Sequence, residues 1–205
     1  MKKDAKTIAG TAILGALVIV FDYSMKFSHL KIPFPWLPYL KFDFTGIPIV
    51  LSLLLFGLTP GATTSAVAFL AILTRSGDLI GASMKALAEF STILGMAFIH
   101  SLLIKSEKLA KASSLILGVT LRITVMFCAN LIILPIYHKI PQTVVIATSP
   151  LTAAFNAIQG TISILLGYLL YDIIVRRISS RISSAHGKKK LPSNTTKQTS
   201  PYPSA

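Results

Sequence analysis

The fold of this sequence is decided by the stretch Phe56-Gly57-Leu58-Thr59-Pro60-Gly61, which interrupts a long apolar block. The block runs from Gly46 to Thr74, and as one helix it would be about 44 Å long, too long for an ordinary bilayer without strong tilt. Proline begins a helix well and interrupts one badly, and flanking glycines suit a tight turn. The pattern therefore predicts two short helices, over 46–58 and 60–74, that meet at this stretch.

The composition of the whole chain is that of a helical membrane protein. Of the 205 residues 53% are apolar and 13% are charged, and the mean hydropathy is +0.70. A soluble domain carries roughly 25% charged residues, and about 20 apolar residues cross a hydrocarbon layer of about 30 Å. We therefore expect an all-α integral membrane protein, folded as a compact six-helix transmembrane bundle. Its predicted spans are 8–27, 46–58, 60–74, 81–104, 112–136 and 150–175.

Basic residues predict the orientation of the chain, because Lys and Arg near the ends of spans accumulate on the cytoplasmic side. They gather at the N-terminus, in segment 105–111 and after Val175. Two cytoplasmic termini require an even number of spans, and the middle basic segment then follows the fourth span. This topology explains most of the net charge of +13, so we expect a multi-pass protein of the cell (plasma) membrane and no nucleic-acid partner.

Residues 179–205 differ in composition from the apolar remainder of the chain. They are rich in Ser, Thr, Lys and Pro and almost free of large apolar side chains. Such segments cannot bury enough apolar surface to fold. We therefore predict a six-helix transmembrane domain over residues 1–178 and a basic, disordered cytoplasmic tail over 179–205.

Ionisable residues inside apolar blocks are costly and are candidates for function. Asp22 and Lys26 are spaced i,i+4, and so are Lys85 and Glu89, so each pair can neutralise itself. We interpret the first pair as structural, whereas the second lies deeper in an apolar context and stays open between a structural and a functional role. Arg122 lies well within the fifth block and needs a partner or a route to the membrane surface.

Amide side chains mark the last two helices. Asn156 and Gln159 are three residues apart, hence on one face of the sixth helix, and Asn130 lies on the fifth. Amides offer both donors and acceptors to a planar polar molecule. The alternative is hydrogen bonding between helices, worth about 0.6 kcal/mol on average.

The segment from Ser28 to Thr45 combines three prolines with five aromatic residues. Prolines reduce the entropy that a loop loses on ordering, so this segment is predicted to form a preorganised aromatic lid. A belt of Trp and Tyr at the membrane interface is the alternative.

Small residues recur every four positions on the first helix, as Ala5/Ala9 and Ala12/Ala16. Such spacing lets another helix approach closely. The spacing alone leaves open whether that helix belongs to this chain or to a partner protein.

The sequence contains no GxxxxGK[ST] phosphate loop, no HExxH and no GxSxG motif, its histidines lack ligand spacing, and Cys128 is its only cysteine. We therefore expect no enzyme, no cofactor and no metal site. Uptake against a gradient would need an ion gradient or the ATPase activity of another chain.

The order of these features resembles one family, the substrate-binding (S) components of energy-coupling factor (ECF) vitamin transporters, most closely the riboflavin type. The resemblance covers about residues 6–175. It rests on four local patterns: Tyr39-Leu-Lys-Phe-Asp-Phe-Thr-Gly-Ile-Pro48, Phe56-Gly-Leu-Thr-Pro-Gly61, Asn130 with Leu134-Pro-Ile-Tyr137, and Ala154-Phe-Asn-Ala-Ile-Gln-Gly160.

The resemblance implies a membrane-embedded subunit that captures a flavin-like vitamin, riboflavin, for ATP-driven uptake by a transmembrane coupling subunit and two ATPase subunits. It also implies that the first helices contact the coupling subunit, which makes Ala5, Ala9, Ala12 and Ala16 candidate interface residues. The candidate ligand-binding residues are Tyr39, Leu40, Lys41, Asp43, Lys85, Glu89, Asn130, Asn156 and Gln159.

Three positions depart from the riboflavin pattern. Gln159 stands where a lysine is usual, Gly46 where an aspartate is usual, and Lys85-Ala-Leu-Ala-Glu-Phe90 replaces a GELANF-like segment. The departures keep a different small vitamin or precursor open as the ligand. A proton-coupled secondary transporter using Asp22 or Glu89, and a membrane scaffold without a small ligand, are the alternatives from other classes.

Overall fold

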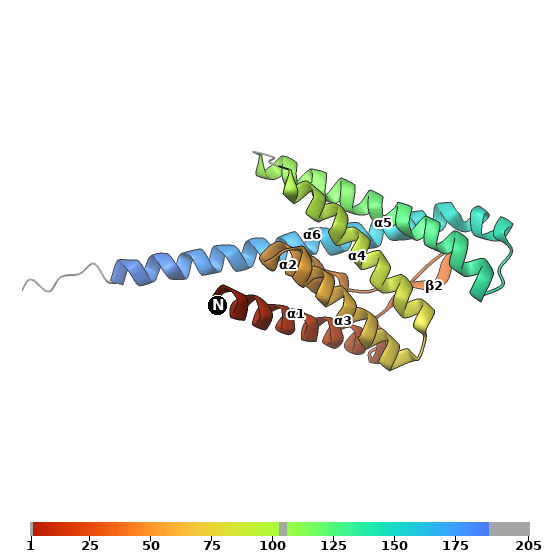
Figure 1. The fold of residues 1–205 in the computed structure, drawn as a ribbon, viewed down its shortest axis with the longest axis horizontal. Coiled ribbons are helices and arrows are strands. Elements are labelled where there is room, and N and C mark those ends of the chain that lie inside the picture. The colour runs from red at the N-terminus through yellow and green to blue at the C-terminus, as the bar shows by residue number, and fades with distance from the viewer. Residues whose placement is uncertain (1, 103–105, 189–205) are drawn as a thin grey trace, which may run out of the picture. The chain divides into compact units, whose positions relative to one another are not determined.

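The computed structural model describes residues 2–102 and 106–188 of the chain. It contains six helices and a two-stranded hairpin, so the predicted six-helix fold is confirmed (Figure 1). The elements are α1 (Lys2–Phe27), β1 (Ile32–Phe34), β2 (Leu37–Phe42), α2 (Gly46–Phe56), α3 (Leu58–Ser76), α4 (Leu79–Ser101), α5 (Glu107–Tyr137) and α6 (Gln142–Lys188).

The long apolar block is split as predicted, and a single residue, Gly57, separates α2 from α3. Gly57 has φ of +99°, in the region that glycine adopts without the penalty that a side chain would cause. Pro60 lies within the first turn of α3, where proline is tolerated. The second helix of the pair therefore begins at Leu58, two residues before the predicted start at Pro60.

Within the described ranges, four helices are long and apolar enough to cross a membrane, namely α1, α4, α5 and α6. The 11 residues of α2 reach only about 16 Å, half of the hydrocarbon thickness. This short helix is buried without a break from Gly46 to Leu53, and its Ile49 and Val50 lie in the main core with Val18 of α1 and Ile93 of α4. The hydrophobic run of α2 thus fills the centre of the bundle.

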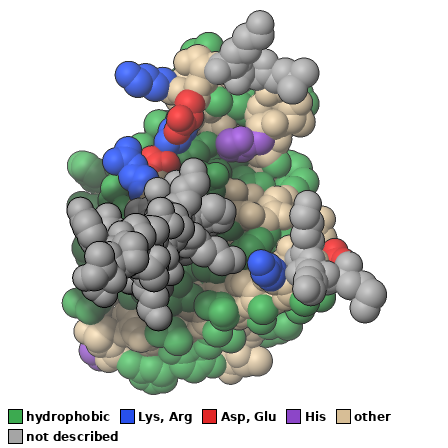
Figure 2. All heavy atoms as spheres, turned by 90° about the vertical axis from the view of Figure 1, so that its left-hand side faces the viewer, with side chains coloured by type: hydrophobic (Ala, Val, Ile, Leu, Met, Phe, Trp, Pro, Cys, Tyr) green, Lys and Arg blue, Asp and Glu red, His purple; other side chains and the backbone are tan. Residues whose placement is uncertain are grey.

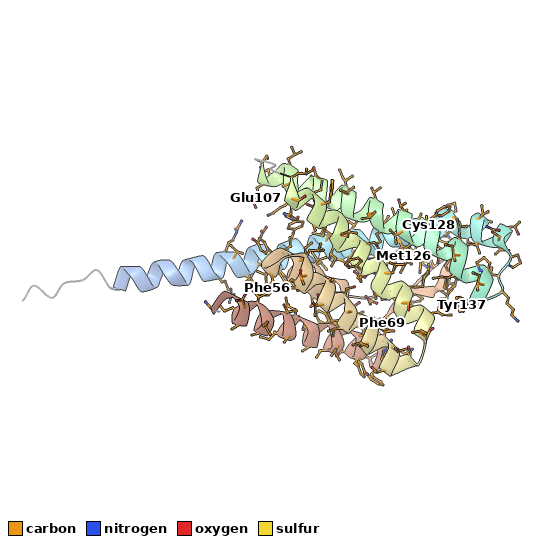
Figure 3. All side chains as sticks on the ribbon, viewed as in Figure 1. Phe56, Phe69, Glu107, Met126, Cys128 and Tyr137 are labelled. Atoms are coloured by element: carbon orange, nitrogen blue, oxygen red, sulfur yellow. The ribbon has the colours of Figure 1, made fainter. Side chains whose placement is uncertain are left out.

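Helices α1, α3, α4 and α5 follow one another across the bundle, each in contact with the next (Figure 1). Helices α4 and α5 approach closely at Gly95 and Gly118, because a Cβ on Gly95 would lie only 2.9 Å from Gly118 Cα. Helix α5 turns the stripe Ser114, Gly118, Arg122 and Met126 inward. Cys128 lies off this stripe and is exposed (Figure 3).

The predicted lid segment contains an antiparallel hairpin, which was not foreseen. Ile32 pairs with Phe42, and Pro33 pairs with Lys41. A hairpin of two strands has only edge strands, where proline is accepted. The hairpin packs on α6 through a small core of Phe34, Leu37 and Phe155. Its connection to α2 brings Asp43 into the bundle.

Hydrophobic side chains also cover much of the surface in the view of Figure 2, as expected of a protein whose surroundings are lipid. Among the described residues, those up to Tyr171 form one compact unit, and those from Asp172 onward form a second unit. Within that unit α6 continues to Lys188, so the predicted start of the tail at residue 179 falls inside a helix. The remainder of the predicted tail, 189–205, lies outside the described residues, and the domain division stays a prediction.

Candidate functional site

Six polar side chains from four parts of the fold meet inside the bundle. We call Asp43, Lys85, Glu89, Arg122, Asn156 and Gln159 the polar cluster. They come from the connection before α2, from α4, from α5 and from α6. Five of the six residues are buried, and Lys85 is the partly exposed member, with 16% of its side chain accessible.

Ion pairs hold the cluster together. Lys85 Nζ lies 2.7 Å from Glu89 Oε1 and 2.9 Å from Asp43 Oδ1, so the predicted i,i+4 pair of α4 forms and also joins the segment before α2. Arg122 Nη1 lies 3.2 Å from the same Glu89 oxygen. Two cations thus face two carboxylates in a region where an unpaired charge is expensive.

Arg122 has the partner that its position in an apolar block demanded. Its Nε donates to Asn156 Oδ1 at 3.1 Å, and its Nη1 donates to Thr92 Oγ1 at 3.1 Å. Arg122 was not among the candidate binding residues, although it is 1% exposed and links α4, α5 and α6. Two signals pointed to it: its charge inside an apolar block, and its place on the same face of α5 as Ser114 and Gly118, because small residues mark a face that packs.

Asp43 is held from two sides. Gln159 Nε2 donates to the Asp43 carbonyl at 2.8 Å, and the Thr45 hydroxyl donates to Asp43 Oδ1 at 2.7 Å. Burial alone would raise the pKa of the Asp43 carboxyl, but Lys85, Lys31 and the Thr45 hydroxyl together hold this pKa below its usual range. Asp43 is therefore a carboxylate that neutralises Lys85.

Two buried atoms of this region have no hydrogen-bond partner among the described residues: Glu89 Oε2 and Ser163 Oγ. Both border Gly46 at the start of α2. A Cβ at Gly46 would lie 2.5 Å from Glu89 Oε2 and would also strike Ser163 Oγ. The absence of a side chain at residue 46 is therefore what lets Glu89 occupy this position.

The remaining candidates lie outside the cluster. Tyr39 of β2 is 62% exposed, Lys41 is exposed, and Leu40 is half-buried against the hairpin core. Asn130 is half-buried on α5, about two turns from Arg122 and on the same face. The structure thus joins Asp43, Lys85, Glu89, Asn156 and Gln159 and leaves four candidates apart from them.

Aromatic rings connect the hairpin to α6. Phe42 and Phe155 have ring centroids 4.8 Å apart, and Phe34 lies 5.7 Å from Phe155. Trp36, which was predicted to belong to the lid, is 66% exposed at the hairpin turn. The hairpin is therefore anchored to the bundle by Phe34 and Phe42, and its role as a lid stays a prediction.

The predicted pairing of Asp22 with Lys26 is wrong. Asp22 is fully buried, its Oδ2 lies 2.5 Å from Arg75 Nε of α3, and its Oδ1 lies 2.6 Å from Lys31 Nζ. Lys26 is exposed. Tertiary partners thus take the place of the neighbour on the same helix. We call Asp22, Lys31 and Arg75 the Asp22 clamp.

The candidate interface residues of α1, namely Ala5, Ala9, Ala12 and Ala16, are all exposed. The opposite side of α1 makes the contacts within the bundle, where Gly15 packs against Val67 and the far edge of the Phe56 ring lies against Gly10. The alanine stripe is thus free of the described bundle.

An apolar groove of about 590 Å³ lies between α3, α4 and α5. Its lining includes Leu94, Phe98 and Leu121, and no residue of the polar cluster. Phe98 is exposed on the apolar surface. We assign the groove no part in the site, because it offers few polar groups that would orient a ligand.

Comparison with known proteins decides the family. No family model matches the chain. The riboflavin transporter FmnP of Bacillus subtilis (strain 168) is 32% identical over 146 residues, which cover 65% of this chain and 76% of that protein. A solved S component of a bacterial ECF transporter matches with a TM-score of 0.71 at 25% identity, over 85% of this chain and 98% of that chain.

The chain belongs to the S components of ECF transporters, of the riboflavin type. As an S component it is a transporter subunit and not an enzyme, as predicted, and it is a membrane protein. This family membership does not support the alternative of a proton-coupled secondary transporter that works alone.

In this S component the three departures from the riboflavin pattern lie side by side. Gln159, where the pattern has lysine, binds the Asp43 carbonyl, while Lys85 of α4 contacts the Asp43 carboxylate. Gly46, where the pattern has aspartate, borders the Glu89 carboxylate of α4. The riboflavin pattern has a lysine on α6 and a carboxylate on α2. In this chain a lysine and a carboxylate are also present, but both belong to α4.

Proposed function

We propose that this S component binds riboflavin, or a flavin close to it, between the hairpin, α5 and α6, with the polar cluster as the polar wall of the site. The observation that carries the proposal is the buried, charge-balanced cluster close to the aromatic rings of the hairpin. Similarity to a riboflavin transporter supports the choice of ligand.

The chemistry of the residues suits a flavin. Its planar ring system carries carbonyl and N–H groups, which amides such as Asn130 and Asn156 match with donors and acceptors. Phe42 and Phe155 offer ring faces and edges for packing. Lys85 has three donors and two carboxylate partners, so one N–H is available for a ligand carbonyl. Tyr39, Leu40 and Lys41 stay proposed contacts from β2.

The test is a riboflavin titration of purified protein in detergent after bound ligand has been stripped. We expect saturable binding of one flavin per chain, measured by equilibrium dialysis. Absence of flavin binding would reject the ligand. Mass spectrometry of the molecule extracted from the protein before stripping would then identify the actual ligand. Another vitamin or precursor is the second candidate, because the lysine and the carboxylate on α4 depart from the riboflavin pattern.

Asn156→Ala is expected to weaken riboflavin binding by about tenfold or more, because it removes an amide of the site and an acceptor of Arg122. Thr148→Ala on the same helix is the matched control, since its half-buried hydroxyl donates only to backbone carbonyls of its own helix. Equal Kd values for the two variants would contradict a ligand site at Asn156.

We infer that uptake also needs a transmembrane coupling subunit and two ATPase subunits, because the sequence has no phosphate-binding loop of its own. The exposed stripe Ala5, Ala9, Ala12 and Ala16 is the proposed contact surface. The double variant Ala9→Leu, Ala12→Leu is expected to lose co-purification with the coupling subunit while keeping the riboflavin Kd. Unchanged co-purification would reject this surface.

We also infer an orientation in the cell membrane with both termini in the cytoplasm, from the basic segments of the chain. The turn between α2 and α3 then faces the cytoplasm. A cysteine in place of the exposed Thr59, in a Cys128→Ala background, is expected to react with an impermeant reagent only from the cytoplasmic side. Labelling from outside in intact cells would contradict this topology.

A further inference from the structure

Glu89 of α4 uses its two carboxylate oxygens unequally. Oε1 accepts from Lys85 at 2.7 Å and faces Arg122 Nη1 at 3.2 Å, whereas Oε2 is buried and has no partner in the part of the chain that the structure describes. Ser163 Oγ also has no partner among the described residues, and the two oxygens border the same side of Gly46. The Glu89 oxygen can only accept, whereas the Ser163 hydroxyl can donate or accept, so most of the unused hydrogen-bonding capacity at this point is acceptor capacity.

The formal charges of the polar cluster cancel. Lys85 is within 3 Å of both Asp43 and Glu89, and Arg122 faces Glu89 while it donates to Asn156. Neither cation is left without a carboxylate. An anion that entered beside the cluster would find both positive charges already compensated, in surroundings where the dielectric constant is low.

We propose that Glu89 determines the ligand charge that this site accepts: together with Asp43 it balances the charges of Lys85 and Arg122, so that the site selects a neutral flavin and rejects the phosphate ester of the same flavin. The inference rests on the proposed function, because it takes a flavin as the ligand. A carbonyl of a neutral flavin can accept a hydrogen bond from the remaining N–H of Lys85. The N–H and O–H groups of the flavin can in turn donate to the acceptor atoms of the cluster. Glu89 is thus a specificity-determining residue.

The experiment compares the Kd of riboflavin with the Kd of flavin mononucleotide, whose phosphate carries about −1.5 to −2 charges near pH 7. The wild type is expected to favour riboflavin by at least about tenfold. Glu89→Gln leaves one positive charge uncompensated, so the ratio of the two Kd values is expected to shift toward the phosphate ester by about tenfold or more.

The matched control is Glu107→Gln, because Glu107 is also paired i,i+4 with a lysine, Lys111, at an exposed place outside the site. Its Kd ratio is expected to equal that of the wild type. Lys85→Met is an independent variant that is expected to change the Kd ratio in the opposite direction. It removes a cation while both carboxylates remain, so it is expected to increase the preference for riboflavin.

Three results would overturn the proposal: equal affinities of the wild type for the two flavins, an unchanged ratio in Glu89→Gln, or loss of all flavin binding in both Glu89→Gln and Lys85→Met. If Glu89→Gln loses flavin binding and Lys85→Met keeps it, the ratio of the two Kd values in Lys85→Met decides. A shift toward riboflavin supports the proposal, and any other result rejects it. A wild type that binds riboflavin but does not discriminate keeps the proposed function and rejects only this inference. A wild type that binds neither flavin rejects the proposed function itself.

Discussion

The Asp22 clamp and the polar cluster each contain a fully buried carboxylate, and they differ in how many oxygens of that carboxylate have a partner. Both oxygens of Asp22 are engaged, one by Arg75 at 2.5 Å and the other by Lys31 at 2.6 Å. Glu89 has one oxygen engaged by two cations and the other without a partner among the described residues. The full pairing of Asp22 agrees with a structural role, whereas the unpaired oxygen of Glu89 calls for an explanation, and our proposal supplies a ligand site as that explanation.

The clamp also shows what a structural ion pair does in this fold. Asp22 belongs to α1, Arg75 to the last turn of α3, and Lys31 to the segment just before the hairpin. The clamp therefore fixes the base of the hairpin to two helices. The polar cluster instead joins the helices α4, α5 and α6 to the segment that follows the hairpin.

The largest effect is expected from Arg122→Met, which leaves Glu89 with Lys85 as its remaining cation and takes a donor from Asn156. Removing one partner of a buried ion pair costs about 3–5 kcal/mol. Thermal unfolding in detergent should therefore occur at a clearly lower temperature, and riboflavin binding should be lost. Arg176→Met, at an exposed arginine, is the control and is expected to change stability by less than about 0.5 kcal/mol.

A smaller loss is expected from Asp22→Asn, which leaves Arg75 and Lys31 without their carboxylate. Both cations are partly accessible, so water compensates in part, and we expect at most about 3 kcal/mol, again measured by thermal unfolding. Asp78→Asn is the matched control, because Asp78 caps α4 and asparagine caps a helix equally well. If Asp22→Asn and Asp78→Asn unfold at the same temperature, the stabilising role of the Asp22 clamp is contradicted.

The smallest of these effects is expected from Gly46→Ala, where the added Cβ would press on Glu89 Oε2 and Ser163 Oγ. Overpacking costs about 1–3 kcal/mol, and we expect a loss at the lower end of this range, about 1 kcal/mol, because the atoms that the Cβ meets are side-chain ends. It should also weaken riboflavin binding, because Glu89 must move. Gly15→Ala is the control, since its Cβ would meet Val67 at an ordinary 3.5 Å. A Gly46→Ala protein as stable as the control would show that Glu89 has room to shift.

Local signals in the sequence were sufficient for part of the fold and of the site. The separation of α2 from α3 follows from glycine and proline chemistry at Gly57 and Pro60, which acts within a few residues. The Lys85–Glu89 pair follows from helix geometry alone. The two amides Asn156 and Gln159 likewise share a face of α6, because they are three residues apart.

Contacts between distant segments explain what the sequence could not predict. Lys26 was an available neighbour of Asp22, but Arg75, on another helix, takes that place once the chain has folded. The partner of Arg122 is likewise a consequence of helix packing and not of spacing. The hairpin was missed because prolines weaken the signal of a strand, although an edge strand accepts them.

The most direct test is a riboflavin titration of two matched variants, Asp22→Asn and Glu89→Gln, each corrected for its folded fraction. Both replace a fully buried carboxylate by the amide of the same shape. We predict that Asp22→Asn keeps the wild-type Kd within about threefold and that Glu89→Gln weakens riboflavin binding by about tenfold. Equal changes of Kd in the two variants would contradict the assignment of the polar cluster as the ligand site.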